Sequence, residues 1–303
     1  MGNKKITSEN TKLVIAISSR ALFNLDHSHK IFKEKGIDAY AKHQQKNEHV
    51  VLEPGVGFTL VKKLLKLNSK KTPIDVILLS RNSADTGLRI FNSIEHYDLN
   101  ISRAAFTRGE STHPFVGAFE ADLFLSSNYN DVQKALQSGY AAASIVESKS
   151  NNSHPSQLRI AFDGDAVIFS DEAERIFQEK GLEAFHENEI LSEKIELKAG
   201  PFKSFLVSLQ KIQSTFPEEN NPIRTALVTA RSAPSHRRVI HTMREWGIRI
   251  DESFFLGGLE KGVFLKQFAA DIFFDDQQQH CESASQYVPT GHVPSGIKNS
   301  QGL

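Results

Sequence analysis

Two pairs of aspartates at the ends of predicted strands are the residues best suited to chemistry in this sequence. Asp163 and Asp165 follow the apolar run at 158–162, and Asp275 and Asp276 follow the run DIFF. In an open parallel α/β sheet, ligands bind beyond the carboxyl ends of the strands. Strands that lie far apart in the sequence would therefore bring these acids to one edge of the sheet.

The four carboxylates favour a cation site and phosphoryl chemistry. Residues at i and i+2 of an extended chain point the same way, so Asp163 and Asp165 can face one substrate in different roles. Asp275 and Asp276 would extend this to an all-oxygen ligand set, which suits Mg²⁺. Aspartate carboxylates also act as covalent nucleophiles towards phosphoryl groups. Because Asp163 ends a strand, we expect its side chain to be exposed.

A threonine and a lysine complete the pattern. Thr229 ends the run TALVT and can donate a hydrogen bond to a phosphoryl oxygen, and Lys261 stands at the start of the helical segment GVFLKQF. Phosphoryl transfer needs charge neutralisation and positioning of this kind. Each residue alone has an ordinary explanation, such as a turn for Asp-Gly-Asp or a helix N-cap for Asp-Asp. Their joint order at strand ends favours a functional site.

The elements that would position these residues are strands alternating with helices. Helical segments have apolar residues three and four positions apart, such as Val61, Leu64 and Leu65. This alternation predicts an α/β fold with parallel sheets and crossover helices. Strands are expected at residues 13–18, 75–80, 122–127, 141–146, 158–163, 225–230 and 271–276.

A polar stretch near the middle of the chain reads as a linker. It covers residues 147–157, ESKSNNSHPSQ, and divides the 303 residues nearly in half. A chain of this length is expected to form about two domains. We therefore expect α/β domains at 1–150 and 151–303. The largely helical segment at about 171–221 is expected to form a small cap in the second domain.

The two halves resemble each other in sequence. With a shift of 145, residues 16–40 align with 161–185 without a gap, and nine positions are identical. From Pro73 onward the shift becomes 149, and Pro73 then aligns with Pro222. A match of this length and period indicates a tandem duplication of one domain.

Composition excludes several classes of protein. Lys plus Arg and Asp plus Glu both number 36, so the formal net charge is zero, which argues against a general nucleic-acid binder. No apolar run approaches the ~18 residues of a membrane helix, and the N-terminus lacks an apolar signal core. Cys281 is the single cysteine, which rules out an intrachain disulfide. We expect a soluble cytoplasmic protein that binds neither membranes nor nucleic acid.

The chemistry-bearing segments resemble a known family. They are similar to the four motifs of the haloacid dehalogenase superfamily and, more narrowly, to the cytosolic 5′-nucleotidase type I family. The resemblance extends into the first half and so covers nearly the whole chain. It is carried by FDGDAVIFSDEAE (162–174), LVTARSA (227–233), LEKGVFL (259–265), DIFFDDQ (271–277), ISSRALFNLD (17–26) and NSIEHYDL (92–99).

This resemblance implies a haloacid dehalogenase-like Rossmannoid sheet and a Mg²⁺-dependent hydrolase of nucleoside 5′-monophosphates. Asp163 would be the nucleophile that forms an aspartyl-phosphate. Asp165 would protonate the leaving ribose oxygen and then activate water.

The resemblance also implies where phosphate and metal would bind. Lys261 would hold phosphoryl oxygens, and only Lys261, not its rival Lys266, is followed by glycine at a helix start. The whole phosphate site would comprise Gly164, Asp165, Thr229, Ala230 and Lys261. The metal site would comprise Asp163, the backbone carbonyl of Asp165, Asp275 and Asp276, with Asp276 orienting bound water.

The first half lacks this chemistry. Its positions aligned with Asp163, Asp165, Thr229, Lys261 and Asp275-Asp276 hold Ser18, Arg20, Ser80, Thr112 and Ser126-Ser127. We therefore expect a non-catalytic copy. It could cover the active half, shape the base pocket, mediate assembly into homo-oligomers, bind an effector nucleotide, or serve as plain structural support.

Two other functions fit the same residues. One is a phosphatase for another small phosphomonoester, such as a sugar phosphate. The other is a regulatory nucleotide-binding protein with vestigial activity. The complete acid set in the second half argues against this second alternative.

Overall fold

The alternating strands and helices build one large, mostly parallel sheet. The computed structural model describes residues 12–146, 148 and 154–299, so residues 147 and 149–153 of the predicted linker 147–157 lie outside the described residues. The strands run in the order β3-β2-β1-β4-β5-β10-β9-β6-β7-β8. Their bounds are β1 Leu13–Ser18, β2 Ile74–Ser80, β3 Arg103–Phe106, β4 Leu123–Ser126, β5 Ala142–Val146, β6 Leu158–Phe162, β7 Ile223–Thr229, β8 Glu252–Phe255, β9 Ile272–Asp275 and β10 Thr290–His292.

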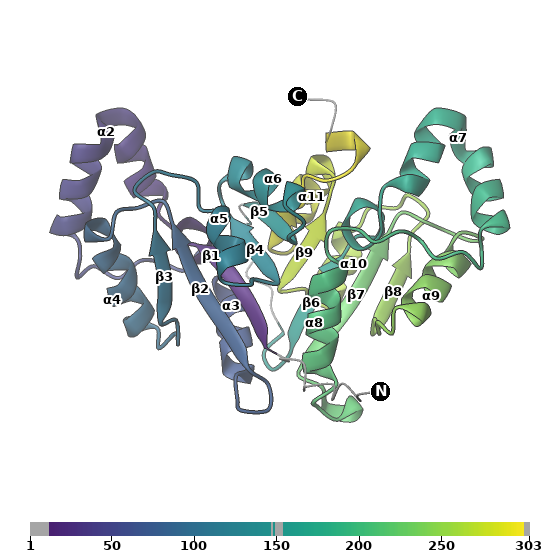
Figure 1. The fold of residues 1–303 in the computed structure, drawn as a ribbon, viewed down its shortest axis with the longest axis horizontal. Helices are drawn as coiled ribbons and strands as arrows, with labels where there is room; N and C mark the ends of the chain where they lie inside the picture. The colour runs from purple at the N-terminus through teal and green to yellow at the C-terminus, as the bar shows by residue number, and fades with distance from the viewer. Residues whose placement is uncertain (1–11, 147, 149–153, 300–303) are drawn as a thin grey trace, which may run out of the picture.

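Helices connect the strands and cover both faces of the sheet (Figure 1). In the first half they are α1 Ser19–Leu22, α2 Asp26–Lys46, α3 Phe58–Leu67, α4 Leu88–His96, α5 Pro114–Ala118 and α6 Tyr129–Gln137. In the second half they are α7 Glu172–Leu191, α8 Lys203–Gln213, α9 His236–Glu245, α10 Gly262–Phe268 and α11 Gln278–Ala284. Four short turns complete the chain: η1 Asp85–Gly87, η2 Gly164–Ile168, η3 Glu218–Asn220 and η4 Ile297–Asn299.

The two halves share strand order and register. Each half places its third, second, first, fourth and fifth strands side by side in that order. Ile17 of β1 pairs with Leu78 of β2, and Phe162 of β6 pairs with Leu227 of β7. Ile17 and Phe162 are 145 positions apart, and Leu78 and Leu227 are 149 positions apart. These are the two shifts that align the sequences of the halves. The strand that ends at Ser18 therefore holds the same place in its half as the strand that precedes Asp163.

The long helices α2 and α7 also correspond. Each is interrupted at one glycine, Gly36 (φ 78°, ψ −175°) and Gly181 (φ 83°, ψ −179°), which are 145 positions apart. A positive φ is strained for residues with a side chain, so glycine suits both bends. Figure 1 shows both helices projecting from the same side of the sheet, at its opposite ends.

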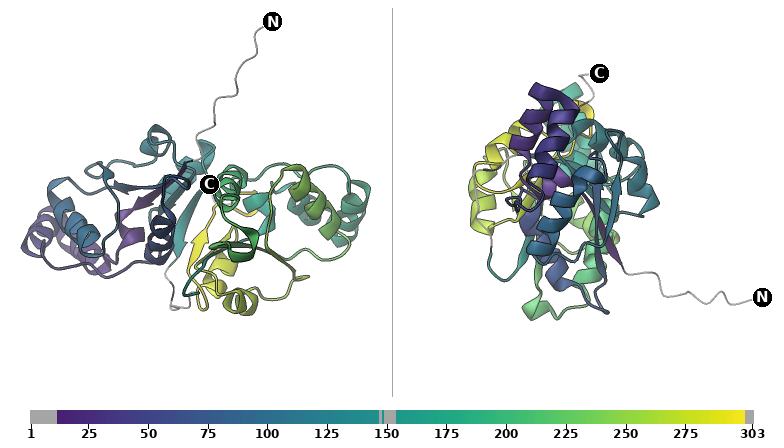
Figure 2. Two further views of the ribbon diagram at one scale, coloured as in Figure 1. Left: turned by 90° about the horizontal axis from the view of Figure 1, so that it is seen from below. Right: turned by 90° about the vertical axis from the view of Figure 1, so that its left-hand side faces the viewer.

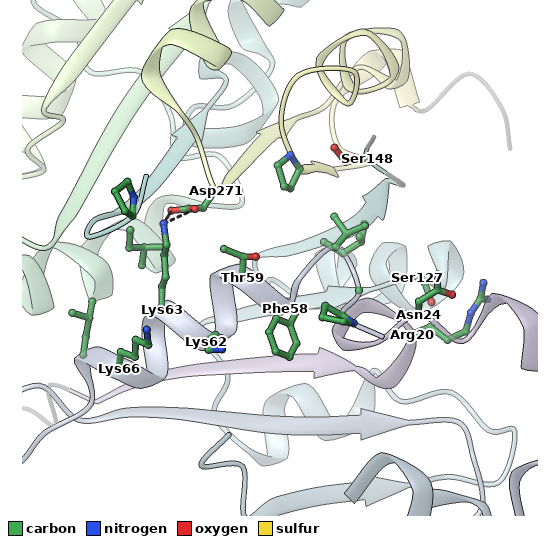
Figure 3. A pocket seen from close by; sticks show the side chains of 18 of the residues that line it. Arg20, Asn24, Phe58, Thr59, Lys62, Lys63, Lys66, Ser127, Ser148 and Asp271 are labelled. Carbon is green, nitrogen blue, oxygen red and sulfur yellow. Dashed lines mark hydrogen bonds and ion pairs between the residues drawn. The ribbon is translucent and has the colours of Figure 1, made fainter. Parts of the chain in front are cut away.

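The halves are joined through the sheet and through side-chain contacts, two of which occupy corresponding positions. Strands β5 and β10 pair antiparallel, which makes the ten strands continuous, and the halves lie side by side (Figure 2). Lys63 of α3 binds both carboxylate oxygens of Asp271 before β9, at 2.7 and 2.8 Å (Figure 3). Ser208 of α8 donates a hydrogen bond of 2.7 Å to Asp122 before β4. Lys63 aligns with Ser208, and Asp271 aligns with Asp122. The two contacts therefore occupy corresponding positions in the two halves.

The hydrophobic core follows the same plan. One cluster runs along one face of the sheet through both halves, and each half has its own cluster on the opposite face. Central strands are buried on both faces, which explains their nearly unbroken apolar sequences. Helix α8 packs into the continuous cluster through Phe205, Leu206 and Leu209. Within 171–221 it is therefore α7, rather than α8, that stands clear of the sheet.

The predicted α/β sheet is confirmed, but three strands were not predicted. They are β3, β8 and β10, which have only three or four residues each and lack the long apolar runs of the central strands. The predicted strands all exist, and their ends differ from the prediction by at most two residues. In the described part of the chain, no helix is both long and apolar enough to cross a membrane.

Candidate active site

The acids that the sequence predicted to meet do lie at one edge of the second half. Asp163 follows β6, and its backbone N–H donates to the carbonyl of Phe274 at 2.7 Å, so the ends of β6 and β9 lie together. The expectation that Asp163 is exposed was wrong, since only 5% of its surface is accessible.

The turn after Asp163 packs closely against Thr229 at Gly164. A Cβ atom on Gly164 would lie 3.3 Å from the hydroxyl oxygen of Thr229, so a larger residue would crowd this threonine. The following turn η2 contains two residues outside helical geometry, Asp165 and Ala166, and Ala166 has a positive φ of 59°. Gly164 and Thr229 are therefore neighbours, as a shared phosphate site requires.

Lys261 bridges two of the acids. Its Nζ atom lies 2.7 Å from Oδ1 of Asp163 and 2.6 Å from Oδ2 of Asp275. All three side chains are buried, and Lys261 begins helix α10 as predicted. The rival Lys266 is exposed near the end of the same helix. The structure thus brings Lys261, and not Lys266, into the group formed by Asp163, Asp275 and Asp276, called the acid cluster below.

The Asp276 side chain is buried beside these groups, and its carboxylate has no hydrogen-bond partner among the described residues. Both of its carboxylate oxygens are enclosed, and no described residue makes a hydrogen bond to either. Asp163, Asp275 and Asp276 can bring one ligand oxygen each to within 4.8 Å of one another. Unpaired buried carboxylate oxygens are costly unless a cation or proton satisfies them. This cluster could therefore bind a metal ion, and its oxygen ligands fit a hard divalent cation.

Burial and neighbouring charges shift the pKa values in this cluster. Burial raises the pKa of Asp163, although the positive charge of Lys261 opposes the change. Burial also disfavours the charged form of Asp275, but Lys261 and His280 outweigh it and lower the pKa of Asp275. Burial, together with the charges of Asp275 and Asp163, raises the pKa of Asp276 to about 10. A bound cation would replace the proton that Asp276 otherwise keeps.

Asp165 points away from this cluster to an arginine. Arg231 donates two hydrogen bonds to its carboxylate, at 2.8 Å from Nε and 2.7 Å from a terminal nitrogen. Arg231 also binds Glu189 of α7, which in turn accepts a hydrogen bond of 2.9 Å from Arg238. Arg231, Glu189 and Arg238 are buried. A continuous ion-pair network therefore links Asp165 to the projecting helix α7.

The remaining predicted residues lie at the end of β7. Thr229 is buried and its hydroxyl accepts a hydrogen bond of 3.2 Å from the backbone N–H of Arg231. That oxygen can still donate its own hydrogen. Ala230 is exposed directly after the strand.

Sequence reasoning missed several residues of the site. Arg231 stands two positions after Thr229, a spacing that in an extended chain signals the same side of the strand. His292 and Asn299 contact the backbone carbonyl of Asp276, each at 2.9 Å. No pattern in the sequence around Glu189 indicates a site residue, because only the folded position of α7 brings Glu189 to Arg231.

A cavity of about 790 Å³ lies elsewhere, between the two halves. It is lined by residues such as Lys62 and Lys66 of α3, and it runs beside the Lys63–Asp271 contact (Figure 3). None of the acids of the cluster lines it. We place the active-site candidate at the acid cluster, where charge and burial support chemistry, and not in this cavity.

Fold and site together define an α/β protein with a buried carboxylate and lysine centre at the carboxyl edge of a parallel sheet. The chain belongs to the 5′-nucleotidase family. It matches the 5′-nucleotidase family over residues 5–300. It is 40% identical over 286 residues to human cytosolic 5′-nucleotidase 1B, a match that covers 90% of this chain and 47% of the relative. The chain thus spans about half the length of that relative. No solved structure matches it.

Proposed function

We propose that this chain is a Mg²⁺-dependent 5′-nucleotidase that hydrolyses nucleoside 5′-monophosphates to nucleoside and phosphate. Family membership supports the reaction, and the unpaired buried carboxylate of Asp276 beside Asp163 and Asp275 is the observation that carries the metal dependence. The zero net charge supports a small-molecule substrate rather than a nucleic acid. We also propose a cytoplasmic location, in line with the name of the human relative.

The proposed reaction begins at Asp163. Its carboxylate oxygen attacks the phosphorus atom and forms an aspartyl-phosphate as the bond to the ribose oxygen breaks. Lys261 and Thr229 hold phosphoryl oxygens, with the backbone at Gly164 and Ala230 beside them. Asp163, Asp275, Asp276 and the carbonyl of Asp165 would hold Mg²⁺, which neutralises phosphoryl charge when bound.

Asp165 supplies the proton in this scheme. It protonates the leaving ribose oxygen, and it then removes a proton from the water that hydrolyses the aspartyl-phosphate. Both of its oxygens accept hydrogen bonds from Arg231 in the structure, so the acid role requires its side chain to turn from that arginine. We propose that helix α7, within the cap expected at 171–221, governs this turn through Glu189.

We further propose that the two halves are duplicated haloacid dehalogenase-like domains, 1–150 and 151–303, of which only the second is catalytic. The shared strand order, the shared register and the paired bends at Gly36 and Gly181 support duplication. In the first half, Ser18, Arg20, Ser80, Thr112 and Ser126-Ser127 replace the catalytic set. Assembly into homo-oligomers stays a prediction.

Phosphate release from a panel of substrates tests the function. The panel should contain purine and pyrimidine nucleoside 5′-monophosphates and a sugar phosphate, each with Mg²⁺ and with a chelator. We expect release from the nucleotides that depends on Mg²⁺. Preference for the sugar phosphate would favour a different phosphatase, and no release from any ester would favour a binding protein.

A further inference from the structure

The first half contains a cavity of about 720 Å³ at the strand edge that corresponds to the acid cluster. Its floor is formed by Ser18 at the end of β1, Asn82 after β2, and Ser126 and Ser127 at the end of β4. One wall is formed by helix α2. This volume lies within the range of about 300–1,000 Å³ that small-molecule sites occupy.

Two buried donor atoms in this cavity have no partner among the described residues. They are Nε of Arg20 and Nδ2 of Asn82, and both residues line the cavity. The other amide atom of Asn82 accepts a hydrogen bond of 2.9 Å from Tyr40, which leaves its NH₂ group unused. The guanidinium of Arg20 has one long contact of 3.3 Å, to the exposed Asp26. Buried donors of this kind indicate an acceptor that occupies the site.

These two positions correspond to an ion pair in the second half. With the shifts of 145 and 149, Arg20 aligns with Asp165 and Asn82 aligns with Arg231. Asp165 and Arg231 satisfy each other through two hydrogen bonds. In the first half both positions hold donors, so the acceptor is missing. An anionic ligand between them would supply it.

The hydroxyl groups of the floor add further donors. The Ser18 hydroxyl oxygen accepts hydrogen bonds from the backbone N–H groups of Ala21 and Ser127, at 3.3 and 3.2 Å. The Ser126 hydroxyl oxygen accepts one of 3.1 Å from the backbone of Asn128. Because these oxygens already accept, their own hydrogens can donate to a ligand. Such a floor suits the several acceptor oxygens of a phosphate group.

The acids around the cavity do not form a cation site. Asp131 is buried but neutralised, because Arg81 binds it through two hydrogen bonds of 2.7 and 2.8 Å. Ser111 and Thr112 also donate to it. Asp38 and Asp85 line the cavity from the outer elements α2 and η1, where Asp85 accepts a hydrogen bond from Gln45.

Helix α2 presents an aromatic wall to the cavity. Phe32 and Tyr40 lie 6.1 Å apart, centre to centre, in an edge-to-face arrangement, and His29 stacks on Phe32. Phe32 is 45% exposed although it lines a cavity, and Ile37 beside it is 61% exposed. Exposed aromatic faces next to hydrogen-bond donors suit a ligand with a planar apolar body.

From these observations we infer that the first half binds a nucleotide-sized phosphorylated ligand in this cavity and does not hydrolyse it. The phosphate would contact Arg20, Asn82 and the serine hydroxyls, and the planar body would lie against α2. The site is separate from the acid cluster and does not depend on the catalytic scheme proposed for the second half.

Calorimetric titration of the full chain in a chelator tests this inference. Without metal, the carboxylates of the second half repel phosphate, so binding there is suppressed. The probes are AMP, inorganic phosphate and adenosine. We expect AMP to bind at one site more tightly than phosphate, and adenosine not to bind detectably. Adenosine binding as tightly as AMP would overturn the phosphate contact.

Matched variants locate the binding. Arg20→Met and Asn82→Asp should each weaken AMP binding at least tenfold. The first removes a positive charge from the cavity, and the second adds a carboxylate that repels the phosphate. The exposed Arg244→Met and Asn100→Asp serve as controls and should bind as wild type. Lys261→Met, in the acid cluster, should also retain binding. Loss of AMP binding in Lys261→Met but not in Arg20→Met would assign the ligand to the second half and overturn the inference. Circular dichroism checks that each variant is folded, and a crystal structure with AMP gives an independent location.

Discussion

The ammonium group of Lys63 lies 2.7 and 2.8 Å from the two carboxylate oxygens of Asp271, and this aspartate side chain is fully buried. Asp271 directly precedes β9, which ends at Asp275. It also accepts a hydrogen bond of 2.8 Å from the backbone of Arg159 in β6, the strand that leads to Asp163. A lysine of the first half thus holds the starts of both strands that carry acids at their ends.

Lys63→Met should therefore destabilise the protein. Removing one partner of a buried ion pair costs about 3–5 kcal/mol, because the remaining charge stays buried. Urea denaturation measures the loss. Lys62→Met, at an exposed position in the same helix, is the control and should change stability by less than about 0.5 kcal/mol. Equal stability of the two variants would mean that the ion pair does not hold the halves together.

Asp163→Asn should abolish turnover while the fold survives. A neutral amide cannot attack phosphorus, and it weakens the acid cluster as a cation site. We expect a loss of about 10³-fold or more. The amide also removes a charge whose burial is costly, so the thermal midpoint should not fall greatly. If the purified variant hydrolyses nucleotides at a rate within about tenfold of wild type, Asp163 is not the nucleophile.

Asp165→Asn should slow the hydrolysis of nucleotides more than that of p-nitrophenyl phosphate. General-acid help scales with the basicity of the leaving group, and nitrophenolate leaves with little protonation. Single-turnover kinetics with both esters measure the difference. If both esters slow by the same factor, Asp165 is not the acid.

Glu189→Gln should destabilise the protein and disturb the site. Glu189 lies buried between Arg231 and Arg238. The neutral variant removes the negative charge that balances these two buried guanidinium groups. We expect a loss of about 3–5 kcal/mol in chemical denaturation. Glu187→Gln, two residues away on the same helix and exposed, provides the matched control. A stability for Glu189→Gln like that of the control would contradict a role for this network in fixing α7.

Asp276→Asn should stabilise the metal-free protein and remove its response to Mg²⁺. Because the pKa of Asp276 is raised to about 10, the folded state keeps a proton that the unfolded chain releases near pH 4. Stability without metal therefore falls as pH rises from about 4 towards 10, and the amide avoids this cost. At pH 8 we expect the thermal midpoint of the metal-free variant to exceed that of the metal-free wild type. The rise should be about 2–4 °C for each kcal/mol gained in the free energy of unfolding. Added Mg²⁺ should raise the midpoint of wild type only, and an equal rise in the variant would exclude Asp276 from the cation site.

Local patterns in the sequence already determined the α/β class, the central strands and the acid positions. A strand buried on both faces requires a continuous apolar run, and a polar residue directly after it lies at the sheet edge. LRIAF followed by Asp163 and DIFF followed by Asp275 carry both signals, and the gapless shift of 145 positions indicated that the halves correspond. The short strands β3, β8 and β10 were not predicted, because pairing with neighbouring strands, rather than their own composition, makes them strands.

Tertiary structure alone decided which groups satisfy one another. The sequence placed Asp163, Asp165, Asp275 and Asp276 at one edge. It could not show that Asp165 pairs with Arg231, or that the Asp276 carboxylate has no hydrogen-bond partner among the described residues. Nor could it show that β5 and β10 join the halves into one sheet, or that Asp163 is buried. Burial and pairing depend on side chains far away in the sequence, such as Lys261 for Asp163 at 98 positions and Lys63 for Asp271 at 208. Patterns of neighbouring residues carry no information about partners this distant. Only the folded chain decides whether a buried charge is compensated by a neighbour or left for a ligand.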